Sequence, residues 1–173
     1  ALKMRAHPTK GFAARLLAAL LLGISSVLAY APANAFPLIW LTLGGLFALL
    51  TTENSHHRTR NGALLSAAFG FGLFIGGVSW IYVSLSVFGG MPTPVAALAT
   101  LVFCLGLSAY PALAGAAYVR FAPPGMWQRS LFFAALWTLS EWLRGWVFTG
   151  FPWLAVGYSQ TPPSPLSGFT PIL

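Results

Sequence analysis

The chain has 173 residues, of which 57% are hydrophobic and only 6% charged, and its mean hydropathy is +0.77. One small soluble core cannot bury that much apolar surface, so the composition excludes an ordinary soluble domain and indicates a membrane protein. The net charge of +7 comes from basic residues scattered between long apolar runs, which argues against nucleic-acid binding. A single cysteine excludes an intrachain disulfide and a cysteine-based zinc site. We predict no metal site and no cofactor.

Apolar segments long enough to cross a bilayer need roughly 20 residues, or fewer where the bilayer thins. In chain order they fall at about 12–31, 36–51, 62–87, 95–119 and 130–148. Because the loops between them are short, successive helices are expected to run antiparallel. The predicted fold class is therefore an all-α membrane protein, with residues 1–148 forming a multi-pass bundle of about five transmembrane helices.

The first segment has an alternative interpretation. Basic residues precede an apolar stretch from Leu16 to Ala29, and Ala33-Asn34-Ala35 stands directly before Phe36. This pattern is also typical of a secretory signal peptide with its cleavage site. Both interpretations place the following segments in the same orientation.

Basic residues predict that orientation. With alternating crossings, all those near the segment ends fall on one side of the membrane: Lys3, Arg5, Lys10, Arg15, Arg58, Arg60, Arg120 and Arg129. Positively charged loops stay in the cytoplasm, so the N-terminus is expected to be cytoplasmic.

Small residues recur every fourth position within two segments, which favours close helix packing in lipid. In the third segment they are Ala68, Gly72 and Gly76, and in the fourth they are Ala96, Thr100, Cys104, Ser108, Ala112 and Ala116. Nothing near Cys104 in the sequence would lower its pKa, so we interpret it as a packing residue and not as a nucleophile.

Two charged residues, Glu141 and Arg144, lie inside the fifth segment. Charges in a membrane segment are costly, so they usually pair or have a function. At a spacing of i and i+3 they could form a structural ion pair. Alternatively, Arg144 lies about one turn from the external end, where its guanidinium could hold a lipid phosphate. The sequence leaves both hypotheses open.

The segment after this helix, residues 149–173, carries no charge and is rich in aromatic residues and proline. It is too apolar for water and too irregular for exposure to hydrocarbon, so protein or a cavity must shield its backbone. We predict that it is the outer lip of a lipid-facing pocket, leading toward a further helix, with an interfacial anchor loop as the alternative. The chain opens on Ala1 and stops at Leu173, and we expect it to be a fragment.

Two blocks of sequence resemble the bacterial apolipoprotein N-acyltransferase family. The first comprises SEWLRGW (140–146), TGFPWL (149–154) and GYSQ (157–160). The second comprises WIYVS (80–84) and FGGMP (88–92), in the right order and at the right distance from the first. The resemblance covers the membrane portion of the family and not its nitrilase-like domain.

The resemblance implies an enzyme of the bacterial inner membrane whose active face is periplasmic. Such enzymes take an acyl chain from a phospholipid, hold it as a thioester on a cysteine, and pass it to the N-terminal diacylglyceryl-cysteine of a lipoprotein. Their catalytic glutamate, lysine and cysteine lie in the nitrilase-like domain, so no catalytic residue is expected in this chain, which we predict to be inactive alone. The implied partners are therefore a phospholipid donor, a diacylated lipoprotein acceptor and the membrane. The predicted lipid- or substrate-binding residues are Arg144, Trp146, Phe151, Pro152, Trp153, Tyr158 and Gln160.

An alternative from another functional class is a complete small multi-pass transport or scaffold protein whose outer loop only anchors it. A transporter is expected to show broken helices and midplane charges in repeat-related positions. The sequence shows one apolar segment with internal charges and no internal repeat, which favours the acyltransferase hypothesis.

Overall fold

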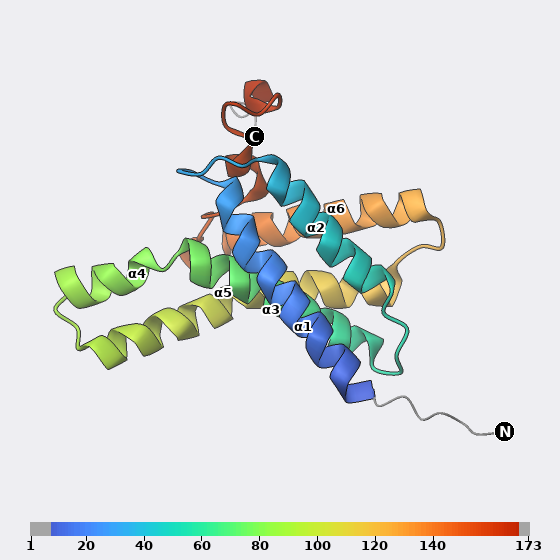
Figure 1. The fold of residues 1–173 in the computed structure, drawn as a ribbon, viewed down its shortest axis with the longest axis horizontal. Coiled ribbons are helices and arrows are strands. Elements are labelled where there is room, and N and C mark those ends of the chain that lie inside the picture. Colours follow the sequence, from blue (N-terminus) through green and yellow to red (C-terminus); the bar gives the residue numbers. More distant parts are fainter. Residues whose placement is uncertain (1–7, 170–173) are drawn as a thin grey trace.

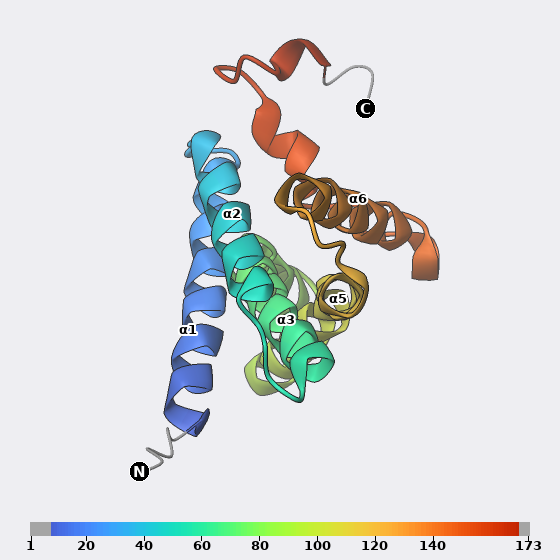
Figure 2. The same cartoon turned by 90° about the vertical axis from the view of Figure 1, so that its right-hand side faces the viewer.

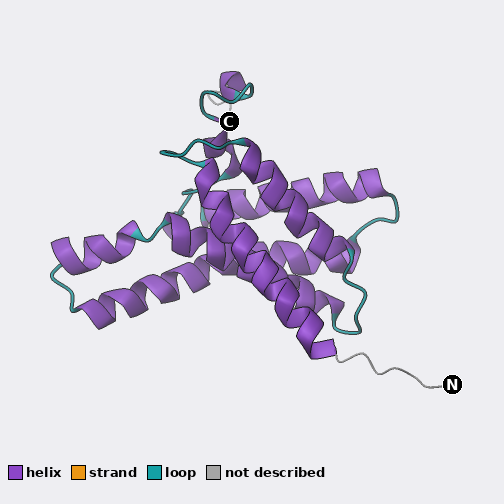
Figure 3. Cartoon of the chain, in the orientation of Figure 1, coloured by secondary structure: helices purple, strands orange, loops and turns teal. Residues whose placement is uncertain are grey.

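The computed structural model describes residues 8–169, which are largely helical and contain no strand (Figure 3). Lys3, Arg5 and the last four residues of the predicted lip lie outside this range, and the side chain of Lys10 is not described. The α-helices of the described chain are α1 (Pro8–Ser26), α2 (Pro37–Thr51), α3 (Arg58–Gly77), α4 (Trp80–Val83), α5 (Thr93–Phe121) and α6 (Met126–Arg144). The predicted all-α class is confirmed.

The helices form three layers, which Figure 2 shows most clearly. α1 and α2 lie side by side on one face, α3 occupies the middle, and α5 and α6 cover the other face. α4 and the first part of α5 extend together away from this bundle (Figure 1). Because α3 packs against both α1 and α5, it is the central helix of the fold.

Two helical stretches of residues 8–169 are long and apolar enough to cross a membrane, Gly11–Ala29 and Thr93–Phe121. α3 together with the helical stretch Trp80–Phe88 makes a third if this bent pair is one span. α2 is apolar but shorter, and α6 does not reach the same apolarity, since it carries Arg129, Glu141 and Arg144.

The predicted segment 62–87 is bent and not one straight helix. α3 ends at Gly77, and the chain resumes as α4 and a π-helical turn (Ser84–Phe88) at an angle of 49° to α3. Glycine lowers helix propensity, and Gly76 and Gly77 stand directly before the bend. A Cβ on Gly77 would lie 2.3 Å from Cδ1 of Leu154, so a residue of the lip packs into the bend. The bend therefore helps to position the lip.

Glycines allow α3 to approach its two neighbours closely. A Cβ on Gly72 would lie 2.3 Å from the carbonyl oxygen of Leu20 in α1. On the α5 side, a Cβ on Gly115 would lie 2.0 Å from Oγ of Ser66. Helices in lipid have no hydrophobic driving force to associate, so close van der Waals contacts of this kind stabilise their packing.

The stripe of small residues on α5 is only partly as predicted. Ala96, Thr100, Cys104 and Ser108 are buried, but beyond them the buried positions include Pro111 and Gly115 and not Ala112 and Ala116. An α-helix has 3.6 residues per turn, so a strict four-residue repeat drifts around the helix and leaves the interface after a few steps. Cys104 is fully buried, in agreement with a packing role.

An ion pair ties α1 to the loop between α2 and α3. Arg15 lies within α1, where its guanidinium contacts the carboxylate of Glu53 and the carbonyl oxygen of Leu49. Burial raises the pKa of the Glu53 carboxyl, but hydrogen bonds from Ser55 and Asn61 and the charge of Arg15 outweigh it, leaving the pKa below its ordinary value. Arg15, which lies near the start of the first predicted segment, thus has an internal partner at the same end of the bundle as Arg58.

Candidate functional site

Residues 148–156, which comprise the last residue of the fifth predicted segment and the first part of the lip, follow α6 in an unusual backbone conformation, and we call this segment the lip turn. Phe148, Thr149 and Leu154 have φ values of 53°, 75° and 60°, and Gly150 has a φ of 80°. Bulky residues rarely adopt the left-handed region, because Cβ then crowds the backbone. The surrounding structure must therefore hold the lip turn in place.

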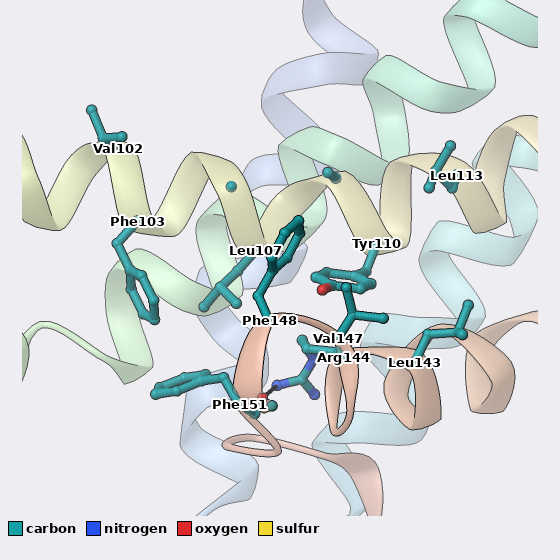
Figure 4. Close-up of a pocket in the computed structure, with 13 residues that line it drawn as sticks. Val102, Phe103, Leu107, Tyr110, Leu113, Leu143, Arg144, Val147, Phe148 and Phe151 are labelled. Carbon is teal, nitrogen blue, oxygen red and sulfur yellow. Dashed lines mark hydrogen bonds between the residues drawn. The ribbon is translucent and has the colours of Figure 1, made fainter.

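A cavity of about 620 Å³ lies between α5 and the start of the lip (Figure 4). It is lined by Val102, Phe103, Gly106, Leu107, Ala109, Tyr110, Leu113, Leu143, Arg144, Val147, Phe148, Gly150 and Phe151. The volume is typical of a small-ligand site, and the lining is apolar apart from Arg144 and the hydroxyl of Tyr110. The cavity is thus suited to an apolar chain.

Aromatic contacts join the lip turn to the extended pair formed by α4 and α5. The ring of Phe151 meets the ring of Phe103 edge to face, with centroids 5.0 Å apart. The ring of Trp153 lies 5.8 Å from that of Trp80 on α4. By contrast, Phe148 is 92% exposed at the cavity wall. Strained backbone residues cluster at functional sites, so the lip turn is a candidate functional segment.

The sequence left two roles open for Glu141 and Arg144, an ion pair or a phosphate contact, and these two described residues make no direct salt bridge with each other. The ion pair found among residues 8–169 joins Arg15 and Glu53. Glu141 instead accepts hydrogen bonds through Oε1 from Trp137 Nε1 (2.9 Å) and from the backbone N–H of Val156 (3.0 Å). The two charged residues are close, since both border a hollow of about 10 Å³. Their hydrogen bonds nevertheless go to different partners, those of Glu141 to two N–H groups and those of Arg144 to backbone carbonyl oxygens.

Arg144 is 3% exposed, and its guanidinium points into the protein. Its Nη1 donates to the carbonyl oxygen of Phe151 (2.7 Å) and to that of Trp153. Its Cζ lies 5.1 Å from the ring centroid of Phe74, on α3. The side chain thus reaches the cavity wall, while its hydrogen bonds go to the lip turn.

The other predicted lipid contacts differ in their positions. Phe151 lines the cavity, whereas Trp146, Pro152, Trp153 and Tyr158 are exposed and do not line it. Gln160 is buried, and its side-chain amide accepts a hydrogen bond from Ser164 Oγ (2.8 Å) and donates one to Ser159 Oγ (2.8 Å). The structure therefore brings Arg144 and Phe151 to one site and leaves Gln160 with a local role in the later lip.

Sequence reasoning missed the α5 side of the cavity. Phe103, Leu107, Tyr110 and Leu113 lie on one face, because they recur at intervals of three or four residues. That spacing was visible in the sequence, but in an apolar segment every face is hydrophobic, so it could not show which face lines a cavity. Phe148 was missed because the sequence predicted it to be the last residue of the fifth helical segment.

The residues that line the cavity include no carboxylate, cysteine or histidine. Cys104 is fully buried in α5 and does not line the cavity. The cavity can therefore accommodate an apolar chain, but its lining offers no group of the kinds that most often act as nucleophile or base.

Comparison with known proteins gives one consistent result. Residues 22–173 match the model of the apolipoprotein N-acyltransferase N-terminal domain. The apolipoprotein N-acyltransferase of Nitrosomonas europaea is 47% identical over 162 residues, which are 92% of this chain and 31% of that protein. The enzyme of the same name from Shewanella oneidensis is 38% identical over 93% of this chain and 31% of its own length. The one from Ralstonia nicotianae is 42% identical over 94% of this chain and 30% of its own. This chain thus spans about a third of the length of these relatives.

Proposed function

Because the chain belongs to the apolipoprotein N-acyltransferase family, we propose that it is the membrane portion of an enzyme that N-acylates lipoproteins. The acyl chain of a phospholipid is transferred to a cysteine thiol, with release of the lysophospholipid. The free amine of the lipoprotein's diacylglyceryl-cysteine then attacks the thioester, which forms an amide and regenerates the thiol. The observation that carries the proposal is the apolar cavity of about 620 Å³ beside the lip, in a chain whose relatives are named N-acyltransferases.

In this proposal the chain contributes lipid binding and the catalytic groups lie elsewhere in the enzyme. The cavity accommodates the apolar chain, with Phe151 in its wall. The exposed residues Trp146, Pro152, Trp153 and Tyr158 lie at the level of the lipid headgroups, where amphipathic rings are favoured. Gln160 supports the later lip through its hydrogen bonds to Ser159 and Ser164. Alone, the chain is expected to form no acylated product.

We expect a chimera to test this function. In it, residues 1–173 replace the matching N-terminal part of the Nitrosomonas europaea relative. Cells depleted of their own N-acyltransferase should grow with the chimera, and their lipoproteins should carry the third acyl chain, detected by mass spectrometry. This chain alone, and the relative without its matching part, serve as controls at matched expression. A stable, well-expressed chimera that leaves the lipoproteins diacylated would contradict the proposal and favour the transport or scaffold alternative.

We further propose that the chain crosses the bacterial inner membrane five times, with its N-terminus in the cytoplasm and its lip in the periplasm. The proposal is supported by basic residues at one side of the bundle, among them Arg58 and Arg60 in the first turn of α3. The uncharged lip follows the opposite end of α6. Length and apolarity identify up to three spans, namely Gly11–Ala29, Thr93–Phe121 and the bent pair. In this proposal α2 and α6 are the other two crossings.

Cysteine labelling tests this topology. In a Cys104→Ala background, Asn54→Cys and Thr161→Cys each place one thiol at an exposed loop position. A maleimide that cannot cross the membrane should label position 161 after the outer membrane is permeabilised, and should label position 54 only after the cells are lysed. Labelling of position 54 in unlysed cells would reverse the proposed orientation.

A further inference from the structure

Contacts with the rest of the protein must hold the lip turn in its conformation, because a strained backbone conformation persists only where the surrounding structure determines it. Three of its non-glycine residues, Phe148, Thr149 and Leu154, have left-handed φ values. A free segment would relax from this conformation. Whatever groups hold the lip turn also determine where Phe148 and Phe151 stand relative to the cavity.

Three side chains from the bundle hold the lip turn through its backbone. Arg144 donates to the carbonyl oxygens of Phe151 and Trp153. Glu141 accepts the N–H of Val156 at 3.0 Å. From the other side of the fold, the hydroxyl of Tyr30 donates to the carbonyl oxygen of Leu154 at 2.9 Å. These backbone groups are partly or fully shielded from solvent, so they would be costly to leave without partners.

The same contacts leave Arg144 poorly placed to bind a lipid phosphate. The ring of Phe74 lies against its guanidinium, two lip carbonyls accept from Nη1, and only 3% of the residue is exposed. A phosphate would have to be desolvated to reach it, which is expensive unless every charge is matched. At Nη1, the carbonyls of Phe151 and Trp153 occupy the positions that phosphate oxygens would have to take.

We infer that Glu141 and Arg144 are positioning residues that clamp the lip turn against the bundle and so keep Phe148 and Phe151 at the wall of the cavity. Neither residue acts by binding phosphate, and neither acts mainly by neutralising the other. Each acts on lip backbone groups of the opposite polarity, Arg144 on carbonyl oxygens and Glu141 on an N–H group. This inference concerns the conformation of the lip and goes beyond the proposed acyl transfer.

Electron paramagnetic resonance of a spin label at the lip tests the clamp without any assay of activity. The label is attached to Pro152→Cys, an exposed position between the two carbonyls that Arg144 holds, in a Cys104→Ala background. The chain is purified in a maltoside detergent without phospholipid, and helical content is checked for each variant. In the parent the label should be immobilised, because the clamp needs no lipid.

Matched substitutions separate the clamp from the two other roles. Arg144→Met and Glu141→Leu should increase the mobile fraction of the label about tenfold or more, since each removes at least one charge-assisted hydrogen bond. Glu141→Gln should keep the label immobilised, because the amide oxygen can still accept from Val156 and Trp137. Arg120→Met is the control, since Arg120 is an exposed arginine in the last turn of α5, where its guanidinium lies over the ring of Phe121.

Each opposite result overturns the inference. If the parent label is mobile in detergent and becomes immobilised only when anionic phospholipid is added, Arg144 binds phosphate. If Glu141→Gln is as mobile as Glu141→Leu, or if Glu141→Gln combined with Arg144→Met restores immobility, the two residues act as an ion pair. In the chimera, Glu141→Gln should restore most of the growth that Glu141→Leu loses. A failure of the chimera as a whole would leave the spin-label result intact, so the two proposals fail separately.

Discussion

Replacing Gly72 with leucine should prevent α1 and α3 from packing and should leave the chain without a stable fold. A Cβ at this position would lie 2.3 Å from the carbonyl oxygen of Leu20 and 2.9 Å from the backbone nitrogen of Ile24. Both are backbone atoms of a helix, which cannot move aside as the end of a side chain can. The loss in the free energy of unfolding should be about 4 kcal/mol or more, at the high end for single substitutions.

The measurement is thermal unfolding in detergent, followed by circular dichroism, with size-exclusion chromatography to detect aggregation. Gly44→Leu in α2 is the matched control, because it adds the same side chain to another glycine of an apolar helix and a Cβ there meets no atom within 4 Å. The control should unfold near the parental temperature. Equal stability of Gly72→Leu and Gly44→Leu would show that the close contact between α1 and α3 is not required.

Replacing Gly150 with alanine should disrupt the lip turn while leaving the helix bundle folded. Gly150 has φ and ψ of 80° and 139°, a conformation that residues with a Cβ rarely adopt. The added Cβ would also lie 2.1 Å from the carbonyl oxygen of Gly145. Backbone strain of this kind costs about 1–3 kcal/mol before the clash is counted, and the lip turn can escape it by leaving its position.

Chymotrypsin provides the readout, because the lip carries the exposed aromatic residues Trp153 and Tyr158. Cleavage in the lip should become much faster in Gly150→Ala, with an unfolding temperature of the helices close to that of the parent. Gly157→Ala is the control, since its Cβ meets no atom within 4 Å and its φ is not left-handed. In the chimera, Gly150→Ala should lose growth and Gly157→Ala should keep it. Parental cleavage rates in Gly150→Ala would contradict our account of the lip turn.

The sequence alone determined the features that depend on local composition. Runs of apolar residues predicted the helices, because a backbone in lipid must satisfy its own hydrogen bonds and a helix does so within one segment. Each expected segment has a helical counterpart in the structure, although α3 and α4 replace one straight helix. The two sequence blocks around residues 80–92 and 140–160 were specific enough to indicate the family that the comparisons show.

Only the tertiary structure decided how those helices meet and what the charged residues do. Glu141 and Arg144 are three residues apart, so the spacing suggested a pair, yet the lip folds back and offers each of them a backbone partner. The sequence indicated only a flanking basic residue at Arg15, whereas the fold brings Glu53, far away in the sequence, into contact with it. In an apolar helix such as α5 all faces look alike in sequence, so the cavity face appears only when the neighbour opposite Phe103 and Tyr110 is known. Helix formation depends on the residues within one segment. Ion pairs, hydrogen bonds and cavities depend on contacts between residues that are distant in the chain, and the sequence pattern of a single segment does not predict those contacts.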